Sequence, residues 1–172
     1  MNKKFFIYFN DGTVKESSLE CTERENGVWN ATITEEIDYS TVNHVEMPVC
    51  DGEMKAGDDG FFLVQPRDFG IGYFRERADI EQVVMTKMPF FGIKHGEDCY
   101  VAIVTGMASD VQQAVRVKDN RYEVNMRFVL GRRAPYENIS VDFHVFKNAD
   151  AKYSDFTRIY RDHQLANGFK SL

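Results

Sequence analysis

The chain has 172 residues, 43% of them hydrophobic and 28% charged, which is the balance of one folded globular domain. The net charge of −6 argues against nucleic acid and against an anionic membrane surface as partners, because both attract Lys and Arg. A neutral ligand such as a sugar would be indifferent to this charge. The 14 Phe and eight Tyr residues favour β-structure, since aromatic side chains suit a pleated surface.

The chain is predicted to begin with a β-hairpin. The apolar residues 5–9 precede residues 10–13, whose Asp-Gly pair supplies the positive φ of a tight turn, and a second strand starts at Val14. The apolar run is too short for a signal peptide, which needs roughly 7–15 apolar residues. Residues 27–33 alternate and predict another strand, whereas residues 35–47 fit either a strand or a loop.

The middle of the chain contains several short apolar runs separated by turn residues. Pro66 ends the first of them, and residues 67–74 are predicted to form a Gly-containing loop that leads into another strand. Residues 94–98 are predicted to form a turn. The strands expected in this region cover residues 61–64, 83–88, 89–93 and 100–104.

A second hairpin is predicted around residues 118–121, between strands at 115–117 and 122–128. Residues 139–146 alternate strictly, except that Phe146 breaks the apolar pattern. The period then changes, because Tyr153, Phe156, Ile159, Tyr160 and His163 form the stripe of an amphipathic helix. We therefore expect residues 1–172 to form one antiparallel β-sandwich domain, closed by a C-terminal helix over residues 151–168.

Metal, cofactor and nucleophile motifs are not found in the sequence. No two histidines stand two to five residues apart, and none lies beside a cysteine with the spacing typical of metal ligands, so no metal site is predicted. The three cysteines match no disulfide framework and are expected to be buried free thiols, with a single bridge left open. No G-x-S-x-G occurs, and the Gly-x-Gly of residues 70–72 precedes strand-like sequence instead of a helix. No cofactor is therefore expected.

Candidate substrate-binding residues follow from loop chemistry and aromatic side chains. Arg67 and Asp68 come just after a strand, and Tyr73 and Arg75 follow in the same Gly-containing segment. Polar groups in a loop on a rigid scaffold are where binding function tends to occur. Trp29 could stack on a sugar ring through its aromatic face. The acidic pairs of the chain fall in turn or solvent positions, and no catalytic residue is predicted.

Three segments resemble a known family. Residues 88–107, the helix at 153–168 with its Tyr-Arg and Leu-x-x-Gly positions, and residues 60–64 are similar to the N-terminal β-sandwich domain of large bacterial glycoside-hydrolase-like proteins. In that family a supersandwich, similar to the galactose mutarotase fold, precedes a catalytic (β/α)-barrel, and the last helix connects the two. The resemblance implies that the catalytic carboxylates lie on the barrel, which this chain lacks. It also implies that the loop at residues 66–70 borders a sugar site.

These observations favour a non-catalytic, carbohydrate-associated module of a glycoside hydrolase. Its expected partners are carbohydrate and either a downstream barrel domain or a second copy, bound through an exposed apolar side of the C-terminal helix. One alternative is a stand-alone sugar-binding module. Another is a mutarotase-like epimerase that uses His95 or His144 with a glutamate. The compartment stays open, because the chain shows no signal peptide whereas relatives by resemblance are often exported.

Overall fold

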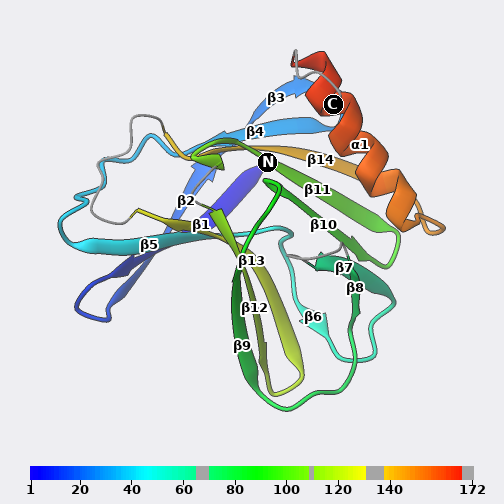
Figure 1. The fold of residues 1–172 in the computed structure, drawn as a ribbon, viewed down its shortest axis with the longest axis horizontal. Helices are drawn as coiled ribbons and strands as arrows, with labels where there is room; N and C mark the ends of the chain where they lie inside the picture. Colours follow the sequence, from blue (N-terminus) through cyan, green and yellow to red (C-terminus); the bar gives the residue numbers. More distant parts are fainter. Residues whose placement is uncertain (65–69, 109–110, 131–137, 168–172) are drawn as a thin grey trace.

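The computed structural model describes residues 1–64, 70–108, 111–130 and 138–167. These residues form two antiparallel sheets packed face to face, with one C-terminal helix on the outer face of the second sheet (Figure 1). The predicted antiparallel β-sandwich with a C-terminal helix is thereby confirmed.

Sheet A has the strand order β2-β1-β5-β13-β12-β9, and the short strand β6 pairs with β13. Sheet B has the order β3-β4-β14-β11-β10-β7-β8. The strands of sheet A are β1 (Asn2–Phe9), β2 (Val14–Glu20), β5 (Val42–Pro48), β6 (Met54–Lys55), β9 (Ile80–Met85), β12 (Val111–Lys118) and β13 (Arg121–Val129). Those of sheet B are β3 (Thr22–Glu25), β4 (Val28–Thr32), β7 (Gly60–Val64), β8 (Gly70–Tyr73), β10 (Phe90–His95), β11 (Asp98–Gly106) and β14 (Ser140–Lys147).

Both predicted hairpins are present. Strands β1 and β2 pair across the turn that contains Gly12, whose φ is +91°. Strands β12 and β13 pair across Asp119 and Asn120, with φ values of 51° and 59°. A two-residue turn with positive φ at both positions matches the twist of the flanking strands, and Asp and Asn tolerate that conformation better than most residues.

The main core lies between the two sheets. Inward-facing side chains alternate along the strands, as in β1, where Phe5 and Ile7 are buried and Lys4 is exposed. Sheet B contributes residues such as Phe91 and Phe143 to the same core. The cysteines are free and buried, as expected for Cys21, Cys50 and Cys99.

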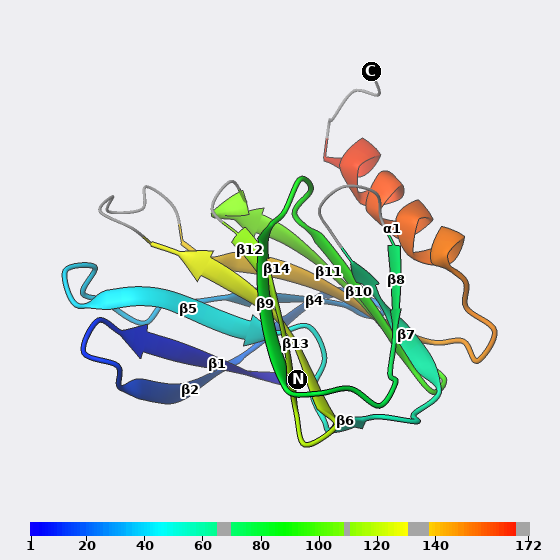
Figure 2. The ribbon, with the colours of Figure 1, turned by 60° about the horizontal axis from the view of Figure 1, so that its bottom comes forward.

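A second core lies between sheet B and the helix α1 (Tyr153–Ala166), which crosses the outer face of that sheet (Figures 1 and 2). Phe156 is fully buried and meets Phe61 edge to face, with ring centroids 5.4 Å apart. Gly92 lets the Phe156 ring pack closely on sheet B, because a Cβ at position 92 would lie 2.9 Å from atoms of Phe156 and Leu63. Phe146 belongs to this second core, and its outward direction explains why it breaks the inward-facing apolar pattern of β14.

The predicted stripe of the helix thus faces sheet B. Phe156 and Tyr160 are buried, and the Tyr160 ring stacks on Phe90 with centroids 4.8 Å apart. The apolar strip that we expected α1 to expose to a partner is therefore covered by the chain itself. Leu165, 53% exposed, is the exposed large hydrophobic residue of α1. Within the described residues no helix has the length and hydropathy needed to cross a membrane.

The sequence interpretation needs one correction and three additions. Residues 70–73, predicted as loop, form the edge strand β8, in which Gly72 leaves room for the ring of Phe62. Part of the ambiguous segment 35–47 is the central strand β5, and the short strands β3 and β6 were not predicted. The helix begins at Tyr153 and ends at Ala166, inside the expected range 151–168.

Replacing Phe156 with Ala should reduce the free energy of unfolding by about 3–5 kcal/mol, because it opens a cavity between α1 and sheet B. Urea denaturation followed by circular dichroism would measure the loss. The matched control is Arg158→Ala on the exposed side of α1, which should change stability by no more than about 0.5 kcal/mol. Equal stability of the two variants would contradict the described packing of α1.

Candidate functional site

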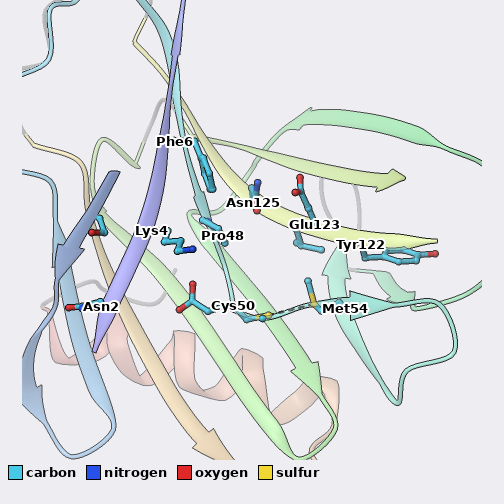
Figure 3. A pocket seen from close by; sticks show the side chains of 13 residues that line it. Asn2, Lys4, Phe6, Pro48, Cys50, Met54, Tyr122, Glu123 and Asn125 are labelled. Carbon is cyan, nitrogen blue, oxygen red and sulfur yellow. Dashed lines mark hydrogen bonds between the residues drawn. The ribbon is translucent and has the colours of Figure 1, made fainter. Parts of the chain in front are cut away.

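The outer face of sheet A carries a hollow of about 520 Å³ between β1, the end of β5, β6 and β13 (Figure 3). Lys4 and Phe6 reach it from β1, because the side chains that alternate with Phe5 and Ile7 point away from the core. Pro48 and Asn125, which face each other across β5 and β13, line it as well. The hollow thus combines half-buried apolar groups with fixed polar ones.

A buried carboxylate lies beside the hollow, two residues before Pro48 and on the same side of β5. Glu46 is 0% exposed and stands opposite Phe6 on one side and Arg127 on the other. Arg116 donates to both carboxylate oxygens, at 2.7 Å from Nη1 to Oε1 and through a second short contact from Nη2 to Oε2. Arg127 Nε donates to Oε2 at 3.2 Å. Such two-pronged pairing fixes the direction of both charged groups.

The cluster extends across four strands of sheet A. Arg116 on β12 stands opposite Glu123 on β13 and Glu81 on β9, and it also donates to Glu81 Oε2 at 2.7 Å. Arg127 Nη2 lies 3.6 Å from Glu81 Oε1. Two guanidinium groups are therefore shared among three carboxylates, only one of which, Glu46, is buried.

Both partners of the central ion pair stay ionised. Burial alone raises the pKa of Glu46, but hydrogen bonds from His44, Arg116 and Asn125 outweigh it and hold that pKa well below its usual range. Burial lowers the pKa of Arg116, and the contacts with Glu46 and Glu81 more than offset this and raise the pKa. Because a carboxylate with so low a pKa is a very weak base, Glu46 is poorly suited to proton transfer near neutral pH.

Aromatic side chains flank the ion cluster. The Tyr8 ring stacks on the His44 imidazole with centroids 4.3 Å apart, and the Arg116 guanidinium lies 5.8 Å from the centre of the Tyr8 ring. Tyr8 and Phe6 are both half-buried. Part of each ring consequently remains accessible on the same face as the hollow.

Of the described residues predicted from the sequence, Tyr73 and Arg75 lie together and Trp29 lies apart from them. Arg67 and Asp68 lie outside the described residues. Tyr73, at the end of β8, is 50% exposed, and the Arg75 guanidinium lies 5.3 Å from the centre of its ring. These two border a second hollow of about 590 Å³ between β8 and β9. Trp29 lies in β4, near the opposite edge of sheet B from β8, and is half-buried against the main core.

The sequence did not single out Glu46, Arg116, Arg127 or Asn125. A signal was present, because Glu46 alternates with the apolar Val45 and Met47, and such a position on a strand points away from the core. The pairing with β12 and β13 could not be read from the sequence. Strand register alone brings the two arginines to Glu46.

Among the described residues, no hydrogen bond joins His95 or His144 to a glutamate, although the charge of Glu25 acts on His144. His95 Nε2 lies 2.8 Å from Asp58 Oδ2 at a turn. His144 lies beneath α1, with its ring centroid 6.0 Å from that of His163. Across the described ranges, no group of three or more His, Cys, Asp or Glu side chains is arranged to hold a metal ion.

Comparison with known proteins gives a likeness of fold. No protein-family model matches the chain, and no curated protein matches it. Its structure is similar to part of the α-N-acetylgalactosaminidase NagBb from Bifidobacterium bifidum, solved in complex with GalNAc, with a TM-score of 0.59 and 14% sequence identity. The alignment covers 82% of this chain and 24% of that one. The chain thus corresponds to about a quarter of the length of a glycoside hydrolase.

The ion cluster should make stability depend on acid pH. The pKa of Glu46 in the folded state lies below its unfolded value of about 4.3, so the cluster stabilises the fold at neutral pH and this contribution fades as pH falls below about 5. Glu46→Gln should lose about 1–3 kcal/mol at neutral pH, because it leaves two half-buried guanidinium groups with only the more exposed carboxylates of Glu81 and Glu123.

Urea denaturation from about pH 7 down to about pH 3 would test this dependence. The stability difference between the parent and Glu46→Gln should shrink as the pH falls. The matched control is Glu16→Gln, since the Glu16 side chain is 59% exposed and pairs with Lys4 at 3.7 Å; its effect should stay within about 1 kcal/mol. A difference for Glu46→Gln that is constant with pH would rule out a depressed pKa.

Proposed function

We propose that this chain is a non-catalytic, carbohydrate-associated module of a glycoside-hydrolase-like protein, with a galactose-mutarotase-like supersandwich fold, and that the face of sheet A holds the sugar. The observation that carries the proposal is the fold likeness to NagBb, in which a sandwich like this one makes up about a quarter of an enzyme named for its action on an amino sugar. The resemblance noted in the sequence points to the same class of parent protein.

The chemistry of sheet A supports sugar binding. Carbohydrate sites combine apolar ring faces with a few fixed polar groups. Phe6 and Pro48 provide half-buried apolar surface, and Asn125 and Glu123 provide polar groups at the same hollow. The strongly depressed pKa of Glu46 favours binding over acid–base catalysis, because general acid–base groups work with pKa values near the operating pH.

The parent protein would supply the catalytic part. We place the contact with a downstream barrel, or with a second copy, on the outward side of α1, since its apolar side packs on sheet B. That outward side presents Arg158, Asp162 and Leu165. A barrel bound there would lie on the opposite side of the sandwich from the hollow in sheet A, so the module would hold sugar at a distance from the barrel.

A second candidate site is favoured by one contact. The Tyr73–Arg75 pair forms an exposed aromatic platform with a cation over it, next to the hollow between β8 and β9. Sugar rings could stack there as well, which is the stand-alone binding site anticipated from the sequence. The two sites offer different aromatic side chains, Phe6 and Tyr73, and are separable by mutation.

Isothermal titration calorimetry with N-acetylgalactosamine, lactose, maltose and cellobiose would test the function. We expect one or more of these neutral sugars to bind, and Phe6→Ala to weaken that binding about tenfold, because one stacking face is lost. Arg158→Ala is the control and should bind as the parent does. If Tyr73→Ala weakens binding and Phe6→Ala leaves it unchanged, the site lies between β8 and β9. No heat with any of the four sugars would refute the proposed function.

A further inference from the structure

Asn125 is the buried polar residue of the hollow in sheet A. Its side chain is 4% exposed, and its Nδ2 donates to Glu46 Oε1 at 3.0 Å. An ionised carboxylate can only accept hydrogen bonds. A flipped carboxamide would place its oxygen against that carboxylate, so the ion cluster fixes one orientation. The carboxamide oxygen therefore lies on the side away from Glu46 Oε1.

In the described part of the chain, the Asn125 side chain donates one hydrogen bond, from Nδ2 to Glu46. No described group donates to its oxygen Oδ1. Asn125 also lines the hollow (Figure 3). Its Oδ1 oxygen is not among the fully buried polar atoms that lack a partner, so solvent reaches it, and a ligand donor can replace water there. The hollow thus offers a fixed acceptor for a hydroxyl or an N–H group.

The charged side chains at the rim of the hollow are already paired. Each has an oppositely charged group within 4 Å, which weakens its attraction for an ionic ligand. Apolar surface from Phe6 and Pro48 lies beside them. The pairs are Lys4 with Glu16 at 3.7 Å, Asp51 with Lys3 at 3.4 Å, and Glu123 with Arg116 at 3.4 Å.

From this geometry we infer that the hollow selects an uncharged polyhydroxylated ligand with one apolar face. Asn125 Oδ1 accepts a hydrogen bond from this ligand. Glu46 is the positioning residue that holds Asn125 in place. The ligand's ring face would lie on Phe6 and Pro48. This inference rests on the proposed function and specifies the ligand class and the recognition residue of that same site.

The first test needs no ligand. In ¹⁵N-labelled protein the carboxamide protons of Asn125 should exchange with solvent at least about tenfold more slowly than those of the exposed Asn10, because the former are buried and bonded to Glu46. The Glu46→Leu protein, which has no acceptor at this position and is first shown to be folded by circular dichroism, should lose most of that difference. Equally fast exchange at Asn125 and Asn10 in the parent protein would overturn the role of Glu46.

The second test uses three related probes at millimolar concentration: methyl α-galactoside, galactosamine and galacturonate, which are neutral, cationic and anionic. The neutral glycoside should shift the Asn125 carboxamide signals most, and its binding should be insensitive to salt. In Asn125→Leu, which keeps the side-chain volume and removes the acceptor, affinity for the neutral probe should fall about tenfold. Arg161→Ala, on the exposed side of α1 and outside both hollows, is the matched control and should bind normally.

The outcomes separate the inference from the proposed function. The inference would be overturned if Asn125→Leu bound the neutral sugar with unchanged affinity, or if either charged probe bound more strongly than the neutral one. Sugar binding by the module would still stand in both cases. No binding of methyl α-galactoside together with no heat from the four sugars above would remove both. Should Asn125→Leu fail to fold, Asn125→Thr keeps a hydroxyl acceptor but shortens its reach, and it should also weaken binding.

Discussion

The position of the charged cluster depends on the outer face of sheet A, which no other layer of the described structure covers. In the described part of the molecule, the inner faces of the two sheets cover each other, and α1 covers the outer face of sheet B. Strand β11 is accordingly apolar in both directions, with Val101 and Ile103 toward α1 and Ala102 toward sheet A. Strand β5 carries the polar residues His44 and Glu46 on its outer side. A cluster of charged side chains can therefore form on sheet A without disturbing either core.

The Glu46 cluster shows how a buried charge is tolerated on that face. Removing a carboxylate from water costs several kcal/mol, and the Coulomb attraction repays this only when the geometry is good and the remaining lone pairs are satisfied. Arg116, Arg127 and Asn125 provide those contacts. Such a pair adds little net stability compared with apolar residues, although breaking it is costly. Its main physical effect is to hold the side chains of β12 and β13 in one orientation.

A rigid polar surface of this kind differs from the loop site that the sequence suggested. Loops were favoured because binding residues tend to lie on them, and Tyr73 with Arg75 does form a platform at the end of β8. The polar groups on sheet A lie on strands, where an alternating charged residue is usually solvated and uninformative. Glu46 was overlooked for that reason, and its segment could not be assigned to strand or loop.

The sequence by itself determined the hairpins, the strongly alternating strands and the amphipathic helix, because these depend on neighbours a few positions apart. The same local pattern placed Phe156 and Tyr160 on the packed side of α1. Only the tertiary structure decided which surface that side covers and which residues meet Glu46. Arg116 is 70 positions away from Glu46 and Arg127 is 81 positions away. Contacts across such distances arise from strand order and register, which the packing of the whole sandwich sets and no local pattern records.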